Sequence, residues 1–177
     1  MERITADKLQ GYCSERGAWQ FLHDVAGSLV QIHAKGNAHC GVTLSNVYLD
    51  GEYFVLGDSV ADGCGSLEDD VWALGASVFL LLMGKPVFYG ENGRKQSATT
   101  KIPRYLSGFS ERISAMVYRC LQYNPMERPL PEEVFETAAK MLEQFPPARK
   151  ERRKVGNTNM DDICSSQDKF WPEEMVN

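Results

Sequence analysis

The sequence lacks the patterns that mark disulfide frameworks, zinc sites and membrane spans. Its five cysteines are odd in number, lie far apart and include no C-x-x-C pair, which argues against such frameworks and favours a reducing compartment. The most apolar run, 71–83, has 13 residues, whereas a membrane span needs about 20. The N-terminus shows no apolar segment of the secretory type. We therefore expect an intracellular, cytoplasmic protein without a membrane span.

Positive charge is also scarce. Lys and Arg number 19 against 24 Asp and Glu, which gives a net charge of −5, and a nucleic-acid partner normally requires a basic face. His, Cys and acidic residues do not cluster at the spacing of metal ligands. These features predict no nucleic-acid partner and no cofactor.

What the chain does have is helical periodicity around one hairpin signal. Apolar residues recur at helical spacing over 14–33, and Gly36 follows as a stop. Further helices are expected over 110–121 and 131–144. After the first helix, residues 46–56 hold Asp-Gly between two β-prone runs, which is typical of a hairpin. The expected fold class is mainly α with a small β-hairpin.

The segment 67–83 is expected to form the central helix of the domain. It is apolar on nearly every face, so it should be buried all round. Ser66, with Asp69 three residues later, can cap its start, and Gly84 can end it in a left-handed turn.

Composition divides the chain into three parts. An N-terminal segment, 1–13, precedes a helical domain over 14–145. The remainder, 146–177, carries a basic run at 149–154 and acidic residues over 161–177. Such segregated charge with little apolar periodicity predicts a disordered tail.

Four short motifs follow one another along the predicted domain. Residues 39–46 read HCGVTLSN, which resembles the catalytic-loop pattern H-R-D-L-x-x-x-N. Residues 70–75 read DVWALG, residues 83–88 read MGKPVF, and residues 120–129 read CLQYNPMERP. In this order the four motifs resemble those in the C-terminal lobe of protein kinases. The resemblance covers about residues 15–144 and implies a kinase C-lobe-like fold.

The resemblance implies structural roles for three residues. Asp70 would hold the backbone of the loop and anchor His39. Arg128 matches the arginine that pairs with the glutamate of the family's A-P-E triplet. The interval before Asp70 contains no such triplet, so Glu68 or Glu127 is the alternative partner.

The residues that would carry kinase chemistry are altered. Gly41 stands where the family has its catalytic aspartate, and Thr43 stands where many members have a lysine. Asn46 and Asp58 match the metal ligands and are the residual candidates for binding a metal or metal–nucleotide, although both are also ordinary turn residues. The resemblance therefore implies no catalytic residue, and we expect the chain not to be an enzyme.

Two further features disfavour nucleotide binding. Tyr48 stands where the family places a small aliphatic residue beneath adenine. No Gly-rich loop and no V-A-I-K-like strand precede the matched region. The pattern is that of a C-lobe alone, resembling a degenerate, truncated pseudokinase.

The leading hypothesis is a catalytically inactive pseudokinase module that acts as a protein-interaction scaffold or regulator. The alternative is a C-lobe completed in trans by another chain, with residual metal–nucleotide binding and atypical phosphotransfer. Expected partners are signalling proteins, including kinases, or a second copy of the chain, bound through the surface around Tyr48. Phe170 and Trp171 are a second candidate motif, with docking back onto the domain as the alternative. The basic run at 149–154 makes the nucleus the alternative location.

Overall fold

The computed structural model describes residues 2–3, 12–59, 65–88 and 101–146. Within these ranges the protein is mainly helical, with a small antiparallel sheet, which confirms the predicted fold class. Most of the predicted N-terminal segment and nearly all of the predicted tail lie outside the described residues, including the basic run, Phe170 and Trp171. None of the described helices combines the length and the apolarity needed to cross a bilayer.

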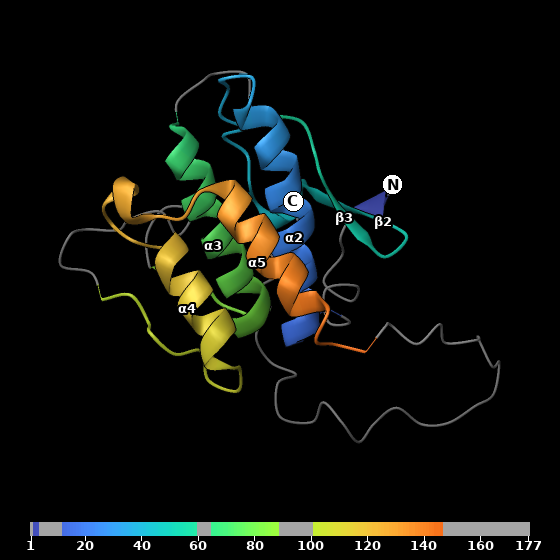
Figure 1. Cartoon of the computed structure of the whole chain (residues 1–177), viewed down its shortest axis with the longest axis vertical. Coiled ribbons are helices and arrows are strands. Elements are labelled where there is room, and N and C mark those ends of the chain that lie inside the picture. Colours follow the sequence, from blue (N-terminus) through green and yellow to red (C-terminus); the bar gives the residue numbers. More distant parts are fainter. Residues whose placement is uncertain (1, 4–11, 60–64, 89–100, 147–177) are drawn as a thin grey trace.

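The first long helix, α2, spans Glu15–His33 and follows the predicted apolar stripe. The Ser14 hydroxyl accepts a hydrogen bond from the Gly17 backbone N–H at 3.1 Å and so caps its start. Gly36, just beyond its end, has a φ of 77°, a conformation that glycine adopts without steric cost. Helix α2 packs against α5, α3 and β3, so it contacts both the other helices and the sheet (Figure 1).

The predicted hairpin is present and gains a third strand. Strands β2 (Val47–Asp50) and β3 (Tyr53–Leu56) pair antiparallel, and Gly51 in the turn between them has a φ of 65°. The two-residue strand β1 (Glu2–Arg3) pairs with the other edge of β2, so the strand order is β1-β2-β3. The sequence did not predict β1, because two residues carry no alternation pattern.

The central helix, α3, spans Leu67–Met83, as predicted. Its start carries the predicted capping box: Ser66 accepts from the Asp69 backbone N–H, and the Asp69 carboxylate accepts from the Ser66 backbone N–H. Gly84 ends the helix with a φ of 64°. The helix is buried as expected, except that one face is half-buried; that face comprises Trp72, Ala73, Ala76 and Leu80.

Two shorter helices complete the domain, α4 (Glu111–Cys120) and α5 (Pro131–Leu142), with the 3-10 turn η3 (Pro125–Glu127) between them. Helix α4 packs against α3, and α5 lies along α2 (Figure 1). The α3–α4 contact is close because Gly75 has no side chain: a Cβ there would lie 2.5 Å from the Cβ of Cys120.

Candidate functional site

One buried carboxylate joins three segments at the start of α3. The Asp70 Oδ2 atom accepts hydrogen bonds from the His39 backbone N–H at 2.6 Å and from His33 Nε2–H at 2.8 Å. The Asp70 Oδ1 atom accepts from the Cys40 backbone N–H at 2.8 Å. Because the Asp70 residue is 2% exposed, these bonds are made away from water and fix the loop relative to the ends of two helices.

The ring of His39 fixes the loop from inside. Its Nε2–H donates to the Gly57 carbonyl at 2.9 Å, and its Nδ1 accepts from the Gly41 backbone N–H at 3.2 Å. These partners require the neutral Nε2–H tautomer. Next to it, Cys40 has a φ of 61°, which costs a side-chain-bearing residue energy and is sustained by the surrounding bonds.

Asn46 and Asp58, the residual candidates for metal binding, lie side by side. The Asn46 Nδ2 group donates to the Gly41 carbonyl at 3.0 Å and to the Asp58 carbonyl at 2.9 Å. The amide nitrogen therefore holds the 3-10 turn η1 (Leu44–Asn46) to the segment after β3, while the exposed Asp58 carboxylate is available to a ligand. Among the described residues no group of three or more His, Cys, Asp or Glu side chains is placed to hold a metal ion.

Tyr48 lies in the middle strand of the sheet and is half-buried. Its ring packs against Gly57: a Cβ at that glycine would lie 2.8 Å from Tyr48 Cε2 and would also collide with Asn46. Tyr48 therefore covers the segment leading to Asp58. The most exposed aromatic side chain of the hairpin is instead Tyr53, at 65%.

Arg128 has an acidic partner, but neither of the two glutamates named from the sequence supplies the carboxylate. Its NH1 group donates to Asp69 Oδ1 at 3.0 Å and to the Glu68 backbone carbonyl at 2.9 Å, and its Nε donates to the Gln122 carbonyl at 2.9 Å. The Asp69 carboxylate thus serves the capping box with one oxygen and Arg128 with the other.

These contacts also set the acidity of Asp69. Partial burial favours the neutral carboxyl, but the hydrogen bonds from the Ser66 backbone and from Arg128 outweigh it, so the pKa of Asp69 lies below its usual value. Arg128 is 7% exposed at its side chain while Asp69 is 57% exposed. The pair therefore joins the start of α3 to the segment before α5 at the edge of solvent.

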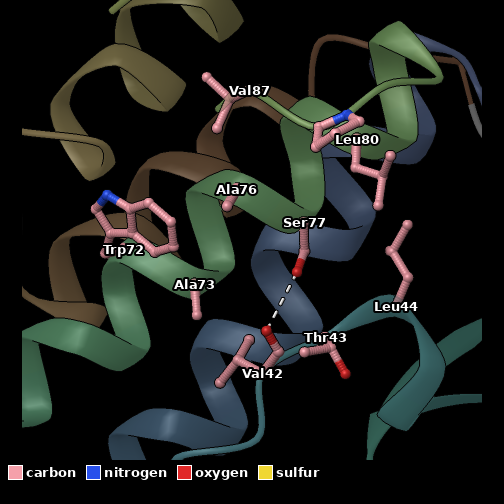
Figure 2. Close-up of a pocket in the computed structure, with 10 residues that line it drawn as sticks. Val42, Thr43, Leu44, Trp72, Ala73, Ala76, Ser77, Leu80 and Val87 are labelled. Carbon is pink, nitrogen blue, oxygen red and sulfur yellow. Dashed lines mark hydrogen bonds between the residues drawn. The ribbon is translucent and has the colours of Figure 1, made fainter. Parts of the chain in front are cut away.

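A groove opens directly beside the loop, between residues 42–44 and the half-buried face of α3 (Figure 2). Its volume is about 110 Å³. Figure 2 shows Ser77 at its base, where the hydroxyl donates to the Val42 carbonyl at 3.2 Å and fastens the loop to the helix. The apolar lining comes from Val42, Leu44, Trp72, Ala73, Ala76, Leu80, Pro86 and Val87.

Curated relatives of the chain are protein kinases. It is 25% identical over 161 residues to the "Probable cell cycle serine/threonine-protein kinase CDC5 homolog" of Encephalitozoon cuniculi, covering 72% of this chain and 34% of that protein. It is 24% identical over 151 residues to the "Wee1-like protein kinase" of Arabidopsis thaliana, covering 70% and 29%. It is 23% identical over 203 residues to the "Serine/threonine-protein kinase ppk11" of Schizosaccharomyces pombe, covering 96% and 61%. The chain is kinase-like.

The chain spans about a third of the length of the first two relatives and 61% of the third. No protein-family model matches it. The expectation that the chain is not an enzyme is wrong. Each of these relatives is a protein kinase, so the relationship points to an enzyme family.

Sequence reasoning missed two features of the site. No role in the site was predicted for His33, yet this residue contacts Asp70 across 37 positions of sequence, a separation for which a single sequence carries no signal. The groove was missed as well, although Ala73 and Ala76, three residues apart, leave room on one face of an otherwise bulky helix.

Proposed function

We propose that this kinase-like module acts as a scaffold or regulator by binding a protein segment in the groove beside residues 42–44. The observation that carries the proposal is the apolar lining of a solvent-open groove next to the loop that resembles a catalytic loop. Apolar concave surface of this kind usually receives a ligand or a partner. The partner class we expect is a signalling protein, and the binding domain we propose spans residues 14–145.

The loop itself is suited to binding. Position 41 is a buried glycine without a proton acceptor, whereas the next side chains, Val42 and Leu44, line the groove. Trp72 stacks on Phe88, with ring centroids 5.9 Å apart, and so forms a fixed wall. A groove of about 110 Å³ suits a single apolar side chain, whose burial contributes about 1.5–3 kcal/mol. A stable complex therefore requires contacts that continue onto the surface around it.

The test is to fill the groove with a charge. Ala76→Glu keeps a good helix former at a half-buried position and places a carboxylate in the groove. In affinity capture from the source cell, we expect this variant to lose the partners that the unaltered chain retains. Ala115→Glu is the matched control, because it makes the same substitution at an exposed position on α4. Capture of the same partners by all three proteins would refute the proposal.

A second candidate function is phosphotransfer by a C-lobe that another chain completes in trans. It is supported by the kinase relatives and by the contact between Asn46 and the Asp58 backbone, beside an exposed Asp58 carboxylate. Both residue types are ligands that Mg²⁺ uses between phosphates. A thermal-shift titration with ATP and Mg²⁺ or Mn²⁺ should then stabilise the chain, and Asp58→Asn should remove the shift. The absence of any shift at millimolar ATP would eliminate this candidate.

A further inference from the structure

A second and larger cavity lies on another side of the central helix. Its volume is about 340 Å³, and it is formed where the end of α2, the start of α3 and the start of α5 meet the α4–α5 connection. We call it the α3–α5 groove. It shares α3 with the groove of Figure 2 but has no lining residue in common with it.

The α3–α5 groove has a buried apolar floor and an exposed apolar rim. Val71, 2% exposed, and the buried Pro129 form part of the floor. Met126, 83% exposed, and Leu130, 68% exposed, stand at the rim. Tyr123, 53% exposed, lies on the same connection. Two large apolar side chains exposed at the rim of one cavity, Met126 and Leu130, indicate a binding surface.

The connection that carries these side chains is held rigid. Pro125, Pro129 and Pro131 each fix one backbone φ angle. Arg128 adds four hydrogen bonds, to the Gln122, Tyr123 and Glu68 carbonyls and to Asp69. A surface that is already ordered loses little conformational entropy when a ligand binds.

The charge that remains at the groove is negative. The positive charge of Arg128 is matched by Asp69, and His33 is bonded to Asp70. Glu68 and Glu132 also line the groove, and within the described part of the chain neither carboxylate has a hydrogen bond or an ion pair. Both sit in the first turn of a helix, where the helix dipole favours a carboxylate.

We propose that the α3–α5 groove binds a segment of a partner protein in which an apolar core is flanked by lysine or arginine. The core would fill the cavity between Val71 and Leu130, and the flanking cations would meet Glu68 and Glu132. Charge complementarity of this kind selects the partner and speeds association. The site goes beyond the proposed function, since it needs neither the loop nor the groove of Figure 2.

Charge also favours this occupant over two others, the C-terminal residues of the chain itself and a second copy of the chain. The chain continues for 31 residues beyond Pro146, long enough to reach the groove, but residues 161–177, which contain Phe170 and Trp171, hold five acids and one lysine. A second copy of the chain carries a net charge of −5. The segment that contains Phe170 and Trp171 would bring negative charge toward Glu68 and Glu132, and so would a second copy of the chain. The basic run at 149–154 contains no apolar residue and so could not supply the core.

The proposal is tested with three fluorescent peptides and the full chain. The first has the core Leu-Trp-Leu with two lysines on each side, the second has the same core with glutamates, and the third has lysines around three serines. By fluorescence polarisation at low salt, we expect the first to bind about tenfold more tightly than either of the others. Equal binding of the lysine-flanked and glutamate-flanked peptides would overturn the proposal.

Two variants locate the binding. Leu130→Asn removes the rim leucine but supplies a favourable N-cap for α5, where Leu130 has no capping hydrogen bond. We expect it to fold and to bind the first peptide about fivefold more weakly. Its matched control is Tyr53→Asn, which alters an equally exposed side chain on the hairpin. The same affinity in both variants would overturn the assignment to the groove.

The double variant Glu68→Gln/Glu132→Gln should lose the preference for lysine flanks, whereas Glu52→Gln/Glu143→Gln, at exposed acids elsewhere, should keep it. Ala76→Glu should leave peptide binding unchanged, so failure of this proposal and failure of the proposed function are separate results. Tighter binding by Trp171→Ser would show that the chain's own tail competes for the groove and would overturn the assignment to a partner.

Discussion

Replacing Asp70 by asparagine is expected to destabilise the domain by about 3–5 kcal/mol. The carboxylate accepts three hydrogen bonds, from the backbones of His39 and Cys40 and from His33. Each bond to a charged acceptor contributes about 1.5–3 kcal/mol. Asparagine keeps one acceptor oxygen, but its NH₂ group must face one of the two backbone N–H groups. Because an NH₂ group cannot accept a hydrogen bond from that N–H, a buried donor is left unsatisfied.

The assay is urea unfolding followed by circular dichroism at pH 7. With a slope of roughly 1.5–2 kcal/mol per molar urea, the expected loss lowers the midpoint by about 2 M. Asp58→Asn is the matched control, since Asp58 is exposed and its side chain makes no hydrogen bond to the described residues. A loss below about 1 kcal/mol for Asp70→Asn, or equal losses for the two variants, would refute the reasoning.

A double-mutant cycle tests whether the Asp70 carboxylate sustains the strained backbone of Cys40. Cys40 is held at a φ of 61° beside Asp70, and glycine adopts this conformation without the cost of about 1–2 kcal/mol that a side chain adds. Cys40→Gly should therefore fold normally and should reduce the penalty of Asp70→Asn by about 1 kcal/mol. Strict additivity would show that the carboxylate does not sustain the strained residue.

Other contacts lead to three further predictions. Gly75→Ala would place its Cβ 2.5 Å from that of Cys120, so we expect a loss of about 1–3 kcal/mol in urea unfolding despite the better helix propensity of alanine, and unchanged stability would contradict the close α3–α4 contact. The pKa of Asp69 is lowered by Ser66 and Arg128 despite partial burial. The stability that the Asp69 carboxylate contributes is therefore complete above the usual carboxyl pKa of about 4 and is lost as the pH falls through the lower folded value. Arg128→Met should make the free energy of unfolding less dependent on pH in that range, and an unchanged pH dependence would argue against the Arg128–Asp69 pair. Burial raises the pKa of Cys120 to about 12, so its thiol should react with a thiol reagent at pH 8 only on unfolding, as mass spectrometry of the labelled peptide would show.

The sequence predicted those parts of the fold that depend on neighbouring residues. The capping box of Ser66 and Asp69, the stop at Gly84 and the hairpin at Gly51 each follow from side-chain chemistry within a few positions. The strand β1 was not predictable, because its two residues pair with β2 more than 40 positions away.

The sequence named His39, Asp70 and Arg128, but it did not predict all of the contacts that they make or the groove beside them. Arg128 was expected to find an acidic partner, yet the choice of Asp69 depends on the docking of the α4–α5 connection against α3, 59 positions apart. The groove of Figure 2 depends on the same kind of information, since it exists only where residues 42–44 meet the half-buried face of α3. Packing across long separations decides both, and a single sequence does not record it.

The placement of the Asp70 carboxylate also ties the motion of the loop to the core. The amide hydrogens of His39 and Cys40 are bonded to this one side chain of the central helix, so these amides can exchange with solvent only when the loop leaves α3. Such an opening breaks buried bonds and therefore belongs to the same cooperative unit as the helix. The binding of a partner to the loop would in this way be coupled to the stability of the central helix.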